Sequence, residues 1–478
     1  MNRRSGQAPS GARDLERYAG LFARRTRSMK SSAMRDLMAI TERPEVISLA
    51  GGLPDTSTFP PDSYAALMAQ VASESCARAL QYGPTEGLAA VKRSVVQVMT
   101  EEGTPVDPDD VLMTTGGQQV IDLVCKALID PGDVIVAEAP TYPGAIPAFL
   151  AYEADVVQIA MDSDGMRIDE LEQTLDRLEE QGRRPKFIYT IPTFQNPGGV
   201  TMSLPRRQRL VALAQERELL VLEDNPYGLL RYEGEALPTL RALEQATIAR
   251  EEASFVIYLG TFSKILSPGA RLGWTVAPRP VLEKLNVGKA STDLCSSPMT
   301  QYFVAAYFDS GQWGPYLRSL RSIYRRRRDA MLDALAEHFG PELEWTRPQG
   351  GLFLWVNLPH YIDTTDLLAR ALGENVAFVP GASAYVDGRG GSAMRLNFSG
   401  VTEERIHEGV RRIGQVVREQ IFLYGTLTGQ RPVAPRADPA DEPAGEAARR
   451  QAGARLADVL HLPRRPASDR RAGTGEDG

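Results

Sequence analysis

Five short, almost continuously apolar segments recur through the middle of the chain, with helical patterns between them. The segments are VLMTT (111–115), DVIVAEAP (133–140), KFIYTIP (186–192), LLVLED (219–224) and FVIYLG (255–260). The stretch that follows Gly117 has helical periodicity, and so does the one that opens after Ser203, a suitable N-cap. Strands that alternate with helices form a mainly parallel sheet covered on both faces. The continuous apolar runs favour strands buried on both sides. The sequence therefore predicts an α/β fold.

Sheets of this kind carry their chemistry just beyond the carboxyl ends of the strands. The first strand is followed by Gly116, Gly117 and Gln118 at the start of a helix. The free N–H groups and the dipole of a helix N-terminus favour an anion such as phosphate, and glycines allow it to approach the backbone. A diglycine before a helix is also typical of a simple tight turn.

Two further strands end in polar residues. Asn196 follows the segment 186–192 in a turn, where asparagine is common in any case. Asp224 ends the segment 219–224 and is followed closely by Tyr227. A carboxylate at the end of a buried strand needs a positive or donating partner, and a protonated ring nitrogen would serve. A helix N-cap or a buried ion pair is the ordinary alternative.

The segment after the fifth strand is the most informative. It places Thr261, Ser263, Lys264 and Arg271 in the spacing S-x-K-x4-G-x-R-x-G. A lysine in such a setting can lose its proton and act as an amine nucleophile. The hydroxyls and the arginine supply a second set of phosphate donors. A solvated surface charge does not account for this combination of residues.

The chain resembles the fold-type I, class I and II aminotransferases, which depend on pyridoxal 5′-phosphate (PLP). Seven motifs match in family order across residues 18–425: Tyr82-Gly83, Gly116-Gly117-Gln118, Tyr142, Asn196-Pro197-Gly198, Asp224 with Tyr227, Ser263-Lys264 with Arg271, and Arg395 in MRLNFS. The segment ISLAGGLPDTSTFP (47–60) is similar to the α-aminoadipate and kynurenine aminotransferase branch. Thr261 stands where that branch often has serine, and Gly117 where it often has serine or threonine.

The resemblance implies a large domain with a mostly parallel, seven-stranded sheet between helices, and a smaller α+β domain. We expect an N-terminal arm and part of the small domain at 18–60, the large PLP-binding domain at 61–300 and the rest of the small domain at 301–425. Residues 1–17 and 426–478 are polar and rich in Gly, Pro and charge, and we expect both to be disordered.

The same resemblance assigns roles around the cofactor. Lys264 would condense with the cofactor aldehyde and later move a proton as base and acid. Asp224 would keep the pyridine nitrogen protonated, so that the ring can accept electrons. Asn196 and Tyr227 would bind the ring 3-oxygen, and Tyr142 would stack on the ring. The phosphate would be bound by Gly117, Gln118, Thr261, Ser263 and Arg271.

The substrate side is assigned in the same way. Arg395 would take the α-carboxylate of the substrate as a bidentate pair, with Asn196 and the backbone of Gly52 beside it. Arg35 would bind a distal carboxylate, although an exposed helix arginine is an equal alternative. We expect transfer of an amino group between an α-amino acid, of the 2-aminoadipate, aromatic or branched-chain type, and a 2-oxo acid such as 2-oxoglutarate. We also expect a homodimer in which Tyr82 reaches the phosphate of the neighbouring subunit.

Two other functions share parts of this pattern. A PLP-dependent lyase or decarboxylase would use nearly the same cofactor site. An aminotransferase-like transcription regulator would need about 60–80 structured residues ahead of the PLP domain, and the 20–45 residues before AGGLPD do not spell a helix-turn-helix.

Composition excludes several other classes. The net charge of -7 argues against a nucleic-acid partner, and no apolar run reaches the roughly 20 residues of a membrane span. The three cysteines and four histidines show no metal-ligand spacing, so we expect no metal and a cytoplasmic enzyme with reduced thiols.

Overall fold

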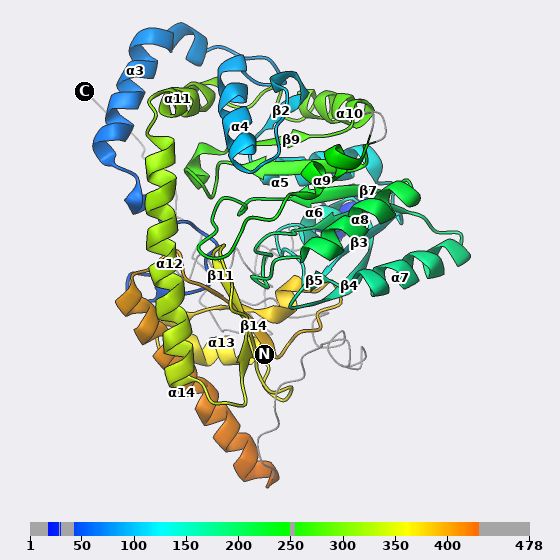
Figure 1. Cartoon of the computed structure of the whole chain (residues 1–478). Helices are drawn as coiled ribbons and strands as arrows, with labels where there is room; N and C mark the ends of the chain where they lie inside the picture. The colour runs from blue at the N-terminus through cyan, green and yellow to red at the C-terminus, as the bar shows by residue number, and fades with distance from the viewer. Residues whose placement is uncertain (1–17, 28, 30–42, 249–253, 430–478) are drawn as a thin grey trace, which may run out of the picture.

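The computed structural model describes residues 18–27, 29, 43–248 and 254–429 (Figure 1). The N-terminal segment 1–17, Arg35 and the chain beyond residue 429 lie outside these ranges, so the expectations for them stay predictions. The predicted start of the disordered tail at residue 426 is wrong, because a helix continues to Thr428.

The core of the molecule is one eight-stranded sheet in the order β2-β9-β8-β7-β6-β3-β4-β5. Its strands are β2 (Val111–Thr114), β3 (Val134–Ala139), β4 (Asp155–Asp162), β5 (Gly165–Met166), β6 (Pro185–Thr190), β7 (Leu220–Asp224), β8 (Val256–Thr261) and β9 (Gly273–Val276). The five predicted strands are all present. The predicted number of seven is wrong, because the chain turns back after β4 and adds the two-residue strand β5 at the edge.

The central strands are parallel. Strands β4, β3, β6, β7 and β8 run in one direction, and β2 shares that direction because both β2 and β8 are antiparallel to β9. Every residue of β3, β7 and β8 is buried except Leu220, which is half-buried. The carboxyl ends of these strands therefore meet at one edge of the sheet, with layers of helices above and below.

Apolar helix faces cover both sides of this sheet. Helices α5 (Gly117–Leu128), α6 (Ile146–Ala151) and α10 (Arg279–Ala290) pack on one face around Leu123, Phe149 and Leu285. Helices α7 (Ile168–Glu180), α8 (Leu204–Glu216) and α9 (Leu240–Thr247) pack on the other around Leu171 and Leu210. Helix α8 begins after the predicted N-cap, Ser203.

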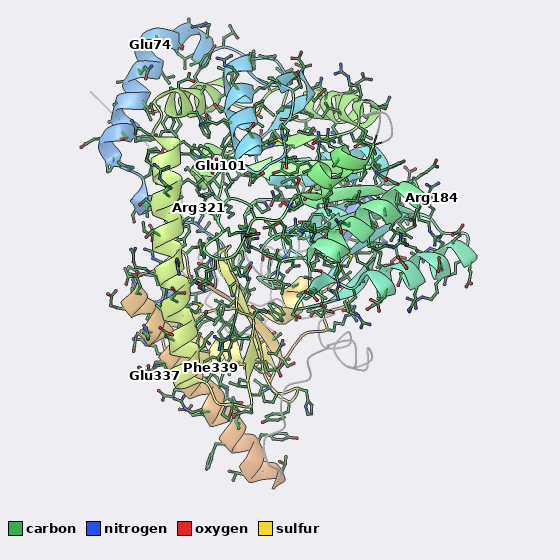
Figure 2. The ribbon with its side chains drawn as sticks, in the orientation of Figure 1. Glu74, Glu101, Arg184, Arg321, Glu337 and Phe339 are labelled. Atoms are coloured by element: carbon green, nitrogen blue, oxygen red, sulfur yellow. The ribbon has the colours of Figure 1, made fainter. Side chains whose placement is uncertain are left out.

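A second group of helices extends the molecule away from the sheet. Helices α3 (Pro61–Ala79), α4 (Ala89–Glu101) and α11 (Pro298–Asp309) pack together beside β2. Helix α12 (Trp313–His338) starts against them and runs to the opposite end of the molecule, where it packs along α14 (Glu403–Thr428) (Figure 1). Side chains fill the space between these ribbons; Arg321 of α12 lies near Glu101 at the end of α4 (Figure 2).

The C-terminal part contains a smaller antiparallel sheet in the order β10-β11-β14-β13. Its strands are β10 (Glu344–Trp345), β11 (Phe353–Asn357), β13 (Val379–Pro380) and β14 (Ala393–Asn397), and α13 (Thr364–Gly373) packs nearby. The N-terminal strand β1 (Ile47–Ser48) pairs with β12 (Val376–Ala377). This pairing brings residues just after β1 beside a sheet that comes more than 300 residues later in the chain.

Short 3-10 helices connect these elements: η1 (Ala19–Leu21), η2 (Arg24–Arg27), η3 (Thr56–Thr58), η4 (Pro108–Asp110), η6 (Pro268–Ala270) and η7 (Gly381–Ala384). Within the described ranges, none of the helices is both long enough and apolar enough to cross a membrane.

Candidate active site

The polar residues predicted at the strand ends converge at one edge of the large sheet. Asp224 is the last residue of β7, and Lys264 follows β8, its neighbour. Tyr142 follows β3 and Asn196 follows β6, while Gly116 and Gly117 join β2 to α5. The parallel order of the strands causes this convergence, since it brings all of their carboxyl ends to the same side.

Asp224 is a buried carboxyl group, only 5% exposed. The phenol of Tyr189, on the adjacent strand β6, donates a hydrogen bond to its Oδ2 at 2.6 Å. Burial raises the pKa of Asp224 to about 7, and the Tyr189 hydrogen bond and the Lys264 charge act against that rise. The carboxyl group therefore depends on these partners to hold its charge.

Lys264 lies close to the same carboxylate. Its Nζ donates to the carbonyl oxygen of Gly52 at 2.6 Å, which ties the segment after β1 to the large sheet. Burial, together with the positive charges of Arg395 and Arg271, lowers the pKa of the amine to about 8, and the charge of Asp224 opposes them. An amine with this pKa exchanges its proton near neutral pH, as a nucleophile or general base must.

An anion site lies at the start of α5. Gly116 is the N-cap residue with φ 81°, and a Cβ on it would come within 2.7 Å of Nη2 of Arg271. The absence of that side chain lets the guanidinium pack against the helix N-terminus. Thr261 and Ser263 are buried beside it and their hydroxyls contact each other at 2.9 Å. Backbone N–H groups, two hydroxyls and a guanidinium are suitable donors for a phosphate.

A second constellation joins the two sheets. Arg395, in the middle of β14, donates from Nη1 to Oδ1 of Asn196 at 2.9 Å and from Nη2 to the carbonyl of Ala50 at 2.8 Å. Its guanidinium lies 4.3 Å from the ring centroid of Phe353. Burial lowers the pKa of Arg395 to about 10, so the group stays charged at neutral pH.

Asn196 links this arginine to the strand ends. Its Nδ2 donates to the hydroxyl of Tyr227 at 3.4 Å, and Tyr227 packs edge-on against Phe353. Burial raises the pKa of Tyr227 well above its usual range, so its phenol keeps its proton. Hydrogen bonds through Asn196 thus join an amide, a phenol and a guanidinium into one connected group.

Glu138, at the end of β3, supports the turn that carries Asn196. Its carboxylate accepts from the Thr190 hydroxyl, from the backbone N–H of Ile191 and from Nε2 of Gln195 at 2.9 Å. Oε1 of Gln195 in turn accepts from the N–H of Gly198. Burial raises the pKa of Glu138 to about 7.

Most of the residues predicted for the site come together here. Gly52 contributes its carbonyl, and a Cβ on it would lie 3.2 Å from the Phe353 ring. Gln118 is exposed at the start of α5 and donates to the carbonyl of Gly144. Burial, followed by the negative charge of Asp224, raises the pKa of the Tyr142 phenol. Tyr82 does not join the cluster: it lies between α3 and α4 with 78% of its surface exposed.

Sequence reasoning missed four residues of the site: Tyr189, Phe353, Glu138 and Gln195. Tyr189 and Glu138 lie inside apolar strand segments. Their polar side chains near the carboxyl ends of these strands were the only feature of the sequence that could have indicated a role in the site. Phe353 is one of 14 phenylalanines and carries no local signal.

The donor set fits the predicted cofactor. The N-terminus of α5 with Arg271 would receive a phosphate, Lys264 an aldehyde and Asp224 a basic ring nitrogen. The glycine at position 116 leaves the space that the guanidinium of Arg271 occupies, so the two residues fit each other at the proposed phosphate site. In the described parts of the chain, no three His, Cys, Asp or Glu side chains gather where a metal ion would bind.

Comparisons with known proteins identify the family of this chain. The family "Aminotransferase class I and II" matches residues 44–413. An aromatic-amino-acid aminotransferase of Thermococcus litoralis is 42% identical over 409 residues, which is 85% of this chain and 96% of the relative. The crystal structure of Pyrococcus horikoshii kynurenine aminotransferase, in complex with PMP, superposes with a TM-score of 0.80 at 40% identity and covers 86% of this chain and 100% of its own.

A second solved structure carries a cofactor derivative. The α-aminoadipate aminotransferase of Thermus thermophilus, complexed with N-(5′-phosphopyridoxyl)-L-leucine, has a TM-score of 0.78 and 37% identity. The match covers 85% of this chain and 99% of that one.

Proposed function

The chain belongs to the class I and II aminotransferases, which transfer amino groups with pyridoxal 5′-phosphate, and we propose that Lys264 and the residues around it carry out that reaction. The observation that carries this proposal is the Lys264 amine, set between the Gly52 carbonyl and the charge of Asp224. Bound PLP supplies an aldehyde that condenses with amines and a ring that draws electrons from the substrate α-carbon.

Lys264 would hold the cofactor covalently and, once displaced by the amino donor, take the proton from the substrate α-carbon. Its pKa near 8 suits this task, since a useful fraction of the amine is unprotonated at neutral pH. The carbonyl of Gly52 orients the amine through its 2.6 Å contact.

Asp224 would hold a proton on the ring nitrogen, which keeps the ring electron-poor. Asn196 and Tyr227 would donate to the ring 3-oxygen, since their side chains already face each other. Tyr142, beside Asp224, would cover one face of the ring.

Gly117, Thr261, Ser263 and Arg271 would bind the phosphate, because they converge at the N-terminus of α5. Gln118 would contribute from the first turn of that helix. Neutral donors at a helix N-terminus together with one cation are suited to anchor a dianion.

Arg395 would bind the α-carboxylate of the substrate. Its contacts with Asn196, Ala50 and Phe353 leave a planar guanidinium fixed in orientation, ready for a bidentate pair. Gly52 would keep the pocket open at this point, since any side chain there would meet Phe353.

For the substrates, we propose 2-aminoadipate, aromatic or branched-chain amino donors, with 2-oxoglutarate as an acceptor. Support comes from the apolar ring of Phe353 beside Arg395, and from the aromatic-amino-acid and α-aminoadipate aminotransferases that are similar in sequence and structure.

The proposal is tested by adding single amino acids to purified holoenzyme and following the cofactor absorbance. Each true donor should convert the band of bound PLP to that of the pyridoxamine form. Lys264→Ala should lower the rate of this conversion by about 10⁴-fold, the upper range for loss of a general base. Lys284→Ala, at an exposed lysine of α10, is the matched control and should leave the rate unchanged. Release of ammonia and a 2-oxo acid from a β-substituted donor without any acceptor would contradict transamination.

The role of Arg35 is tested by substrate comparison. Arg35→Ala should raise the KM for a dicarboxylic donor more than the KM for leucine, because only the former has a distal carboxylate. Arg43→Ala, in the same N-terminal segment, should change neither KM. Equal effects of Arg35→Ala on both donors would remove the assignment.

We also propose a homodimer with shared active sites. Exposed apolar side chains gather around Tyr82: Leu80 is 69% exposed, and the loop at Gly83 adjoins Pro298, next to exposed Met299. Such a patch is typical of an interface. Sedimentation velocity should show a dimer, and Tyr82→Phe should weaken cofactor binding if its phenol reaches the neighbouring phosphate. A monomer with full activity would contradict both statements.

A further inference from the structure

We propose that Tyr189 is a positioning residue that keeps the shared proton on the cofactor ring nitrogen, by donating its phenol hydrogen to the carboxylate of Asp224. The inference rests on the proposed role of Asp224, and it adds a residue from a different strand to the electron-sink half of the site.

The geometry of neighbouring strands produces this contact. Tyr189 on β6 is in register with Leu222 on β7, and Asp224 lies two residues further along β7. Residues two apart on a strand point to the same face, so Tyr189 and Asp224 share the face covered by α5 and α6. A tyrosine is long enough to reach the diagonal neighbour, and its hydroxyl lies 2.6 Å from Oδ2.

The ring of Tyr189 has no freedom to move away. Its side chain is fully buried and packs edge-on against Phe149 of α6, with ring centroids 5.4 Å apart. A buried phenol that loses its partner bears the full cost of desolvation, so the hydrogen bond is held in place by packing as well as by charge.

The hydrogen bond from Tyr189 also gives the two carboxylate oxygens of Asp224 different roles. Tyr189 occupies Oδ2, and within the described ranges no side chain donates to Oδ1. Oδ1 is therefore the oxygen that can face the ring nitrogen. One oxygen is fixed to the sheet while the other remains for the cofactor.

Asp224 is surrounded by groups that act on its charge from several elements. Lys264, after β8, favours the ionised form. In the described part of the chain, Tyr142 after β3, Glu138 at the end of β3 and Tyr227 after β7 are further titratable side chains that interact with its charge. Burial and the negative charge of Asp224 raise the pKa of Tyr189 well above its usual range, so the phenol stays protonated and always donates.

The hydrogen bond affects how one proton is shared between two bases, the Asp224 carboxylate and the ring nitrogen of the cofactor. A hydrogen bond to the charged form of a carboxylate lowers its proton affinity. With the Tyr189 bond present, Asp224 is the weaker base and the proton stays on the ring nitrogen. Without it, Asp224 competes for the proton and the ring draws electrons less strongly from the substrate.

Tyr258 provides a matched control on the other neighbour of β7. It is also fully buried, on β8, and is in register with Glu223, so it points to the opposite face of the sheet from Asp224. Its hydroxyl donates to Glu102 and accepts from Nδ2 of Asn225. Tyr258→Phe removes the same atom from the same sheet without touching the Asp224 carboxylate.

The decisive measurement is the ¹⁵N NMR resonance of ring-labelled PLP bound to the holoenzyme near neutral pH, since it moves with protonation of the ring nitrogen. Wild type and Tyr258→Phe should show the protonated position. Tyr189→Phe should be displaced toward the unprotonated position. A Tyr189→Phe resonance that coincides with wild type would overturn the proposal.

Kinetics should separate the same variants. Tyr189→Phe should lower kcat by about 10- to 100-fold, the range that loss of one hydrogen bond to a charged group produces, with KM for the amino donor changed less than about twofold. A purely structural role would instead raise KM, lower cofactor occupancy and leave the ¹⁵N position of the bound fraction unchanged, and that combination would overturn the proposal.

A second variant covers the case in which Tyr189→Phe does not fold. Placing 3-fluorotyrosine at position 189 gives a stronger hydrogen-bond donor of almost the same size, so the ¹⁵N resonance should lie at least as far toward the protonated position as it does in wild type. A displacement toward the unprotonated position would overturn the inference. If the proposed role of Asp224 itself is wrong, the ¹⁵N resonance should not change in Asp224→Asn. If only the inference about Tyr189 is wrong, Asp224→Asn should still displace the resonance while Tyr189→Phe should not.

Discussion

The two halves of the proposed active site, one for the cofactor and one for the substrate, are built in different ways. The cofactor half, with Asp224, Lys264 and the Gly116–Gly117 turn, lies entirely at the strand ends of one sheet. The substrate half joins segments from three distant parts of the chain: Ala50 after β1, Asn196 after β6, and Arg395 on β14. Parallel strands by themselves align the first set, whereas the second exists only where the small sheet docks against the large one.

The difference in construction corresponds to a difference in function between the two halves. The cofactor half carries buried ionisable groups whose pKa values are shifted by burial, Asp224 upward and Lys264 downward. The substrate half instead holds one permanent cation with neutral oxygen contacts and an aromatic ring. The first half tunes proton affinity, and the second fixes the orientation of a carboxylate.

The largest effect is expected in the substrate half. Arg395→Lys keeps the charge but loses the bidentate fork, and kcat/KM for every α-amino donor should fall by about 100-fold. Affinity for the cofactor should stay within about twofold of wild type if the halves are separable. Steady-state kinetics and a PLP titration of the same preparation measure both quantities. A parallel fall in cofactor affinity would show that the two halves act as one unit.

A smaller effect is expected from the charge buried in the cofactor half. The folded-state pKa of Asp224 is raised from 3.8 to about 7, so its contribution to stability is full below pH 4 and is lost as the pH rises toward 7. Asp224→Asn does not titrate. In cofactor-free protein it should therefore gain stability over wild type between pH 4 and pH 7, and the gain should grow as the pH rises.

Asp293 is a control of opposite sign for this measurement. Burial acts to raise its pKa, but hydrogen bonds from Lys289, Thr115 and Gln119 outweigh it and the pKa is lowered. Asp293→Asn should therefore be less stable than wild type at neutral pH and should approach it as the pH falls through the native pKa. Urea unfolding at a series of pH values compares the three proteins. The same pH trend in both variants would contradict the assignment of Asp224 as a destabilising buried charge.

The smallest effect is expected at the phosphate turn. Gly116→Ala places a Cβ at φ 81° and 2.7 Å from Arg271, so it adds a clash to the backbone strain. Gly132→Ala, at φ 90° with open space around it, has the strain alone. Gly132→Ala should lose about 1 kcal/mol of stability, and Gly116→Ala should lose more because of the added clash. Only Gly116→Ala should also weaken PLP binding, by about tenfold. Equal PLP affinities would show that Arg271 is not part of the phosphate cradle.

The cofactor half was predictable because its residues follow apolar strands in a fixed order. Asp224 and Lys264 can be located from the strand ends alone, and the five strands lie within one or two residues of their predicted ranges. The edge strand β5 was not predictable, since a two-residue strand carries too little periodicity. The role of Tyr189 could not be predicted, because a tyrosine inside a strand segment is as typical of an apolar core as of a functional site.

Strand periodicity is a local property of the chain, so the α/β architecture and the polar residues at the strand ends could be predicted from the sequence alone. The groups that hold those residues in place depend on how distant segments pack. The pairing of β1 with β12 brings the carbonyls of Ala50 and Gly52 to Arg395 and Lys264, and the register of β6 with β7 brings Tyr189 to Asp224. Such contacts depend on distances between atoms that lie 35 to 345 residues apart, and no local pattern encodes them.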